Sequence, residues 1–248
     1  FGCDWIAFLL ASICAYLGFR ARFYLLKAGV NLYMSIAIAA FVSTFAAWLT
    51  TFLPGWTTTP LHPLLACALF IVPGVPLINF VDDMMEGNHQ VGLIRATNTA
   101  MMMVGMAFGI AFALMFCGIT FGFKPDIMGI PMVPHHQYWE YALAAAISGM
   151  GFSMIFNIPK RLLWVAALGA IIAVCTRNFV SLRPDECCSF SLGLGGVIGS
   201  LAGSALVSLI ALKAVHWLHT PNHVITISSV IPMVPGVLMY RALYSFIQ

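Results

Sequence analysis

The segment Gly29–Leu53 reads GVNLYMSIAIAAFVSTFAAWLTTFL and contains no Asp, Glu, Lys or Arg. A helix needs about 20 apolar residues to cross a lipid bilayer, and this segment is longer than that. The rest of the chain is similar, because 61% of its 248 residues are hydrophobic and only 8% are charged. Soluble domains carry about 25% charged residues, which excludes a soluble fold. An all-α bundle of transmembrane helices is expected, because helices satisfy their own backbone hydrogen bonds in lipid.

Apolar runs separated by polar or proline-containing breaks predict eight membrane spans. Pro54-Gly55 and Asn157-Ile158-Pro159 are two such breaks, since a helix seldom continues through proline. The expected spans are Trp5–Phe19, Gly29–Leu53, Leu61–Val81, Val91–Phe121, Trp139–Phe156, Leu162–Asn178, Phe190–Lys213 and His223–Ile247.

The spans group into two predicted modules. We expect residues 1–121 to form a first transmembrane module, 122–138 an external loop and 139–248 a second module. Seven of the eleven basic residues fall in alternate loops, which places those loops in the cytoplasm. Because Phe1 is not an initiator methionine and no cleavable signal sequence follows it, we expect the chain to be part of a longer protein.

Two predicted spans contain the same tetrapeptide. Val-Pro-Gly-Val occurs at Val72–Val75 in the third span and at Val234–Val237 in the eighth. The third span is predicted to run inward and the eighth outward, so the copies are antiparallel, which is typical of inverted-repeat transporters. The counts match if one helix is missing at each end of the chain. The parent protein would then have five plus five helices.

Proline and glycine within a span predict broken helices that bind a solute. Pro73 and Pro76 have no N–H, so the carbonyls of Leu69 and Val72 lose their usual donors. Gly74 lets the chain leave helical geometry. Freed carbonyls can bind a cation, and N–H groups that open a half-helix can bind a carboxylate. Pro235 and Gly236 predict a second broken helix of this kind in the second module. The alternative is a simple kink whose carbonyls are satisfied by neighbouring side chains.

Around these motifs the chain resembles the threonine/serine exporter family of bacterial inner-membrane proteins, over nearly its whole length. The first half matches a Pro-Gly-x-x-Leu run, an Asp, a Gly and a Gly-x-x-Arg. The second half resembles the second module, which in some bacteria is a separate polypeptide. The residues that carry the resemblance are Val72–Asn79, Asp83, Gly87, Gly92, Arg95, Phe156–Arg161 and Ile231–Tyr240.

This resemblance implies a ten-helix, multi-pass carrier of the bacterial inner membrane that exports threonine and serine in antiport with protons. It also implies a cytoplasmic region before the first helix, which this chain lacks. The split form of the family is linked to dicarboxylate export, which leaves a succinate-type substrate as the alternative.

The densest polar cluster follows the third span. Asp83 is the expected proton-accepting carboxylate and Arg95 its partner, because ionisable groups inside membranes are functional by default. Asp82 precedes the residue that matches the family, so which of the two acts is open. Glu86 lies three residues from Asp83 and can share its helix face. A solvated cytoplasmic loop is the alternative for all three.

Three polar side chains complete the expected substrate site. Asn79 follows the first break, Asn157 lies beside Pro159, and Tyr240 follows the second break. Either amide can bind substrate, but it can equally cap a half-helix or bridge two helices.

The composition also bounds the functional class. A net charge of +3 is too small to indicate nucleic-acid binding, and no HExxH or GxSxG motif indicates an enzyme. No metal or cofactor is expected, and the partners are threonine, serine, protons, lipid and a further copy of the chain. A membrane-embedded enzyme or a channel remains the alternative of another class.

Overall fold

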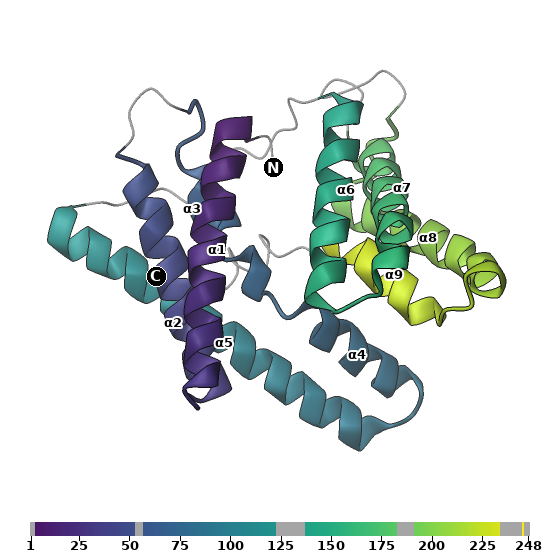
Figure 1. Cartoon of the computed structure of the whole chain (residues 1–248), viewed down its shortest axis with the longest axis horizontal. Helices are drawn as coiled ribbons and strands as arrows, with labels where there is room; N and C mark the ends of the chain where they lie inside the picture. Colours follow the sequence, from purple (N-terminus) through teal and green to yellow (C-terminus); the bar gives the residue numbers. More distant parts are fainter. Residues whose placement is uncertain (1–2, 53–56, 123–136, 183–190, 234–244, 246–248) are drawn as a thin grey trace. The chain divides into compact units, whose positions relative to one another are not determined.

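A computed structural model of the chain describes residues 3–52, 57–122, 137–182, 191–233 and 245, and these contain helices and turns but no strand. The helical elements form two compact units, one from α1 to α5 and one from α6 to η3 (Figure 1). The elements are α1 Trp5–Lys27, α2 Leu32–Thr50, α3 His62–Ala66, η1 Leu69–Ile71, α4 Gly74–Met85, α5 His89–Phe121, α6 Tyr138–Ile155, η2 Lys160–Leu162, α7 Leu163–Ser181, α8 Gly196–Leu218, α9 Asn222–Val230 and η3 Ile231–Met233.

Five described helices are long and apolar enough to cross a membrane: α1, α2, α5, α7 together with η2, and α8. A sixth span is possible if His62–Ile71 and Gly74–Met85, which are bent by 52°, count as one. The predicted fifth span forms α6 but is less apolar, because it opens with Tyr-Trp-Glu-Tyr. The predicted eighth is described only to Met233. The count of eight spans is therefore not confirmed.

Two predicted boundaries are wrong. The first helix does not end at Phe19 but continues to Lys27, because Arg and Lys are good helix formers and their charge does not end a helix. Gly29, two residues beyond the end of α1, has φ of 79° and completes the helix cap. The helix predicted from Phe190 begins only at Gly196, since the backbone of Leu192–Leu194 bonds to the end of α7 instead.

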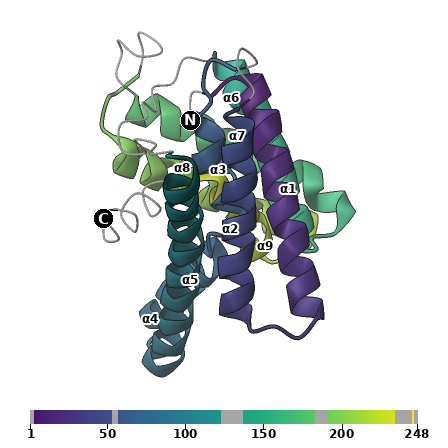
Figure 2. The same ribbon diagram turned by 90° about the vertical axis from the view of Figure 1, so that its left-hand side faces the viewer.

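Small residues hold the first unit together. In Figure 2, α1, α2 and α5 run side by side. A Cβ at Gly109 of α5 would overlap the Ala37 carbonyl oxygen and lie 2.8 Å from the Ala40 Cβ in α2. A Cβ at Gly18 of α1 would lie 2.8 Å from the Ser43 Cβ. Such close backbone approach is how membrane helices gain packing contacts, because lipid offers no hydrophobic drive for their association.

The second unit is packed in the same way around α7. A Cβ at Gly149 of α6 would lie 2.6 Å from the Ala170 Cβ in α7. On the α8 side, a Cβ at Gly203 would lie 2.6 Å from the Ala173 carbonyl oxygen. Thus α7 is the central helix of this unit, in contact with α6, α8 and α9.

Candidate functional site

The third predicted span is broken at the first Val-Pro-Gly motif. Val72 leaves the helical region, with φ of −54° and ψ of 121°, as expected for a residue before proline. Pro73 has φ of −78° and ψ of 63°, which is the geometry of an inverse γ-turn. The 3₁₀ turn η1 ends just before this point and α4 begins at Gly74, and both Pro73 and Gly74 are buried. The predicted helix break is therefore present in the first module.

The carbonyls at this break have donors from the chain itself. The Val72 N–H donates to the Leu69 carbonyl oxygen at 3.2 Å, and the Gly74 N–H donates to the Val72 carbonyl oxygen at 2.8 Å. The start of α4 also has few free donors, because Pro76 has no N–H and the Leu77 N–H donates to the Pro73 carbonyl oxygen. The backbone groups at this break are thus mostly hydrogen-bonded to one another rather than free to bind a solute. The role of these residues in binding stays a prediction.

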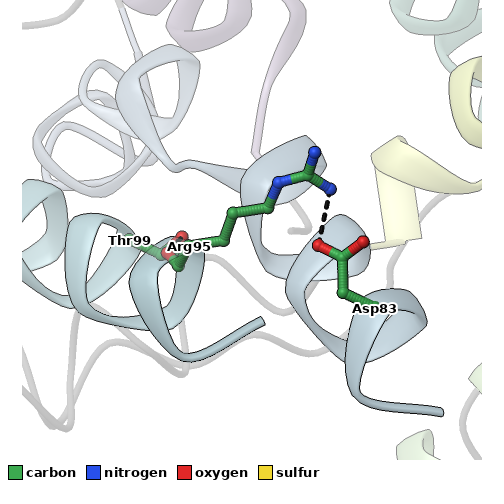
Figure 3. Close-up of polar contacts among 3 residues, drawn as sticks. All are labelled: Asp83, Arg95 and Thr99. Carbon is green, nitrogen blue, oxygen red and sulfur yellow. Dashed lines mark hydrogen bonds and ion pairs between the residues drawn. The ribbon is translucent and has the colours of Figure 1, made fainter. Parts of the chain in front are cut away.

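The structure distinguishes the acidic residues of α4 from one another. Asp82 and Glu86 are exposed, whereas the Asp83 side chain is only 15% exposed. Asp83 Oδ2 lies 2.6 Å from Arg95 Nη1 (Figure 3). The Arg95 side chain is 48% exposed, so one side of the pair faces away from the protein. The predicted pairing of Asp83 with Arg95 is present, while Asp82 and Glu86 do not share it.

A tight turn brings the two charges together. Gly87 has φ of 83°, a conformation that side-chain-bearing residues avoid. The Asn88 N–H donates to the Asp83 carbonyl oxygen and the Gly87 N–H to that of Met84, the two bonds of a Schellman motif. A Cβ at Gly92 would lie 2.9 Å from the Met84 Cγ, so α4 and α5 pack closely beyond the turn. The result is a helical hairpin with the ion pair between its arms.

The ion pair lies toward one end of a very long helix. α5 has 33 residues, which corresponds to about 50 Å, whereas the hydrocarbon core of a bilayer is about 30 Å thick. Its apolar part ends at Phe121, so the opening turns with Arg95 have room to extend past the hydrocarbon. A position at the membrane interface is consistent with the half-exposed guanidinium.

Two polar side chains of α5 beyond Arg95 also make hydrogen bonds. Thr99 Oγ1 donates to the Arg95 carbonyl oxygen at 2.7 Å, and the Tyr33 hydroxyl donates to Asn98 Oδ1 at 3.0 Å. The sequence analysis did not select Tyr33. No local pattern could have found it, because Tyr33 and Asn98 are 65 residues apart in the chain.

In the second unit, Asn157 occupies a helix cap. It has φ of 54° and its N–H donates to the Met154 carbonyl oxygen, while the Ile158 N–H donates to that of Ser153. This is again a Schellman motif, here at the end of α6. The side chain is exposed. The geometry therefore favours the capping alternative for Asn157, and substrate contact by its side chain stays a prediction.

Pro235, Gly236 and Tyr240 lie outside the described residues, so the second copy of the motif stays a prediction. The described part of this segment ends with the 3₁₀ turn η3 at Met233. In sequence, Val234-Pro235-Gly236 follows directly.

Comparison with known families gives two matches, one for each half of the chain. Residues 1–117 match a family model described as "Putative threonine/serine exporter", and residues 141–248 match one described as "Threonine/Serine exporter, ThrE". The chain belongs to the threonine/serine exporter family. It is therefore a multi-pass membrane protein of a transporter family, with both family modules fused in one polypeptide.

One curated relative is named after a different solute. The chain is 29% identical, over 114 residues, to the "Probable succinate transporter subunit YjjP" of Klebsiella aerogenes. The match covers 46% of this chain and 43% of that protein, so the chain spans less than half the length of this relative. No solved structure is significantly similar to the chain.

The geometry explains the residues by which this exporter-family chain resembles its relatives in the first module. Asp83 and Arg95 form the ion pair, Gly87 supplies the left-handed turn, and Gly92 permits the close approach of Met84. All four act in a single α4–α5 hairpin, which makes this hairpin and the break before it the candidate site.

Proposed function

We propose that the protein is a secondary transporter of the bacterial inner membrane that exports threonine and serine in antiport with protons. In this proposal Asp83 accepts the coupling proton and the helix break at Pro73 and Gly74 binds the solute. Asn157, Pro235, Gly236 and Tyr240 of the second module are candidates for further solute contacts, while Asp82 and Glu86 act at most as secondary acidic groups.

The observation that carries the proposal is the half-buried ion pair between Asp83 and Arg95, about two and a half turns of helix beyond the break. Pro76, Asn79 and Asp83 follow one another at intervals of three and four residues, so they lie along one face of α4. A solute bound along this face would be near the carboxylate. Protonation of Asp83 would remove its attraction for Arg95 and loosen the contact between α4 and α5, which couples the proton to movement of the hairpin.

The test is transport by the purified chain in lipid vesicles, with labelled threonine and serine and an imposed pH gradient. We expect Asp83→Asn to abolish the stimulation of transport by the pH gradient while threonine-for-threonine exchange continues, because the amide cannot carry a proton. The matched control is Asp82→Asn, which changes the same chemistry at the exposed neighbouring position. If Asp83→Asn responds to the gradient as the unchanged chain does, Asp83 is not the coupling group.

A dicarboxylate is the second candidate substrate, supported by the relative named as a succinate transporter subunit. A doubly negative solute requires positive charge in the site, and Arg95 is already offset by Asp83. Labelled succinate in the same vesicles decides between the two classes. Saturable uptake against a concentration gradient would also exclude a channel, and the size of the complex in detergent would test whether further subunits or copies take part.

A further inference from the structure

Two arginines have a buried side-chain nitrogen without a hydrogen-bond partner among the described residues. They are Arg22 in α1 and Arg177 in α7, and in both the atom is Nε. Within the described residues an ion pair joins Arg95 to Asp83, and neither Arg22 nor Arg177 has such a carboxylate there. Both residues are half-buried as a whole. A guanidinium is always charged and shares its charge with Nε, so shielding that N–H without a hydrogen-bond partner is costly. In a membrane helix such a residue indicates a function.

Extension of the side chain to the membrane surface does not satisfy the buried Nε of these arginines. Arg22 lies five residues before the end of α1 at Lys27, close enough to reach the interface. Arg20, in comparison, is exposed as a whole and stacks on the ring of Tyr24 at 4.8 Å. The Nε of Arg22 is instead shielded within the protein, on the face of α1 that packs against its unit.

Both arginines follow a small buried residue by four positions, which is about one helical turn. Gly18 precedes Arg22, and a Cβ there would lie 2.8 Å from the Ser43 Cβ of α2. Ala173 precedes Arg177, and its carbonyl oxygen would lie 2.6 Å from a Cβ at Gly203 of α8. Each arginine therefore lies one turn past a point at which its helix nearly touches the next one.

Each of these close contacts also adjoins the 3₁₀ turn before a Val-Pro-Gly motif. A Cβ at Gly18 would lie 3.0 Å from the Phe70 Cζ in η1, and Val72-Pro73-Gly74 follows η1. Ala173 packs with Met233 of η3 in the core of the second unit, and Val234-Pro235-Gly236 comes next in sequence. The two units, each considered alone, thus repeat one local arrangement of arginine, small residue and 3₁₀ turn.

We propose that Arg22 binds the carboxylate group of the transported solute in the first unit, and that Arg177 has the same role in the second. Guanidinium is the side-chain group best suited to this, because its N–H groups match a carboxylate with two parallel hydrogen bonds. Threonine, serine and succinate all carry a carboxylate, so the proposal names the shared chemistry. It rests on the proposed transport function and deepens it.

The experiment measures competition for transport by the whole chain in lipid vesicles. Threonine is compared with threoninamide, which keeps the amine and the side chain but lacks the carboxylate, and succinate is compared with its monoamide. We expect Arg22→Gln to weaken competition by threonine roughly 10- to 100-fold, as for a lost hydrogen bond to a charged group. Competition by threoninamide should stay unchanged. Arg22→Lys should restore part of the preference. Arg177→Gln is tested in the same way, with Arg20→Gln and Arg161→Gln as exposed controls.

The outcomes separate this proposal from the proposed function. If the unchanged chain transports none of threonine, serine and succinate, the proposed function fails. If it transports one of them and Arg22→Gln or Arg177→Gln keeps the full preference for the carboxylate over the amide, that arginine does not bind the carboxylate. A glutamine variant that weakens competition by the acid and by the amide equally has lost structure rather than a carboxylate contact. If Arg22→Lys gives the same result, the proposal is overturned.

Discussion

Asp83 and the acidic residues beside it at the end of α4 illustrate how position separates residues of similar chemistry. Asp82, Asp83 and Glu86 have similar chemistry, yet only Asp83 combines a half-buried carboxylate with a cation at 2.6 Å within the described chain. The sequence limits the candidates for the proton-accepting carboxylate to these three residues. The final choice depends on the turn at Gly87, because this turn sets which face of α4 meets α5.

Gly87 can be tested by a single substitution. Nothing lies within 4 Å of a Cβ added there, so Gly87→Ala causes no clash. It should lower the free energy of unfolding by about 1–2 kcal/mol, because alanine disfavours a φ of 83°. The matched control is Gly151→Ala in α6, where space is also open but the backbone is helical, and this should stabilise by about 0.5–1 kcal/mol. Denaturant unfolding in detergent measures both. Equal effects of the two substitutions would contradict the assigned turn.

The Tyr33–Asn98 contact shows why some of the candidate site was missing from the sequence analysis. The sequence predicts the pairing of Asp83 with Arg95, because ionisable groups inside a membrane are functional by default and both residues match the family's motif. Tyr33 is an aromatic residue near the start of an apolar helix, where it is equally suited to a lipid interface. Only the packing of α2 on α5 brings it to Asn98.

At the scale of the elements, hydropathy predicted where helices lie better than where they begin and end. α1 continues through Arg20 and Arg22 because helix formation depends on backbone hydrogen bonding and propensity, which charge does not interrupt. The break at Pro73 was predicted, because loss of an N–H is a local property. The γ-turn that satisfies the Val72 carbonyl was not predicted, since it depends on the conformation of the neighbouring residues.

The contact between α2 and α5 yields a sharper test of packing. In α5, Gly109→Ala would push a Cβ into the Ala37 backbone, which cannot rotate away, and should destabilise the protein by about 3 kcal/mol. The control Ile119→Ala in the same helix removes a side chain that is 77% exposed and should change the unfolding free energy by less than about 0.5 kcal/mol. Denaturant unfolding in detergent again provides the measurement. A tolerated Gly109→Ala would show that the two helices are farther apart.

For the whole molecule, the distribution of basic residues predicts a direction in the membrane. Ala28→Cys and Asn88→Cys, each in a cysteine-free background, should react with an impermeant thiol reagent only from the cytoplasmic side. Pro60→Cys should react only from the opposite side. All three positions are exposed, so accessibility within the protein does not limit the reaction. Right-side-out and inverted vesicles provide the comparison, and labelling of Ala28→Cys from outside would reverse the assigned orientation.

The break at Pro73 has a mechanical consequence. Bending a regular helix breaks hydrogen bonds that reach back four residues, whereas the bonds from Val72 and Gly74 reach back only three and two. The chain therefore already contains a pivot that can change its angle with little loss of backbone bonding. This pivot lies at one end of α4 and the Gly87 turn at the other, while α5 is held against α2 at Gly109. A change of angle at the pivot would therefore move α4 relative to α5 and alter the separation of Asp83 from Arg95.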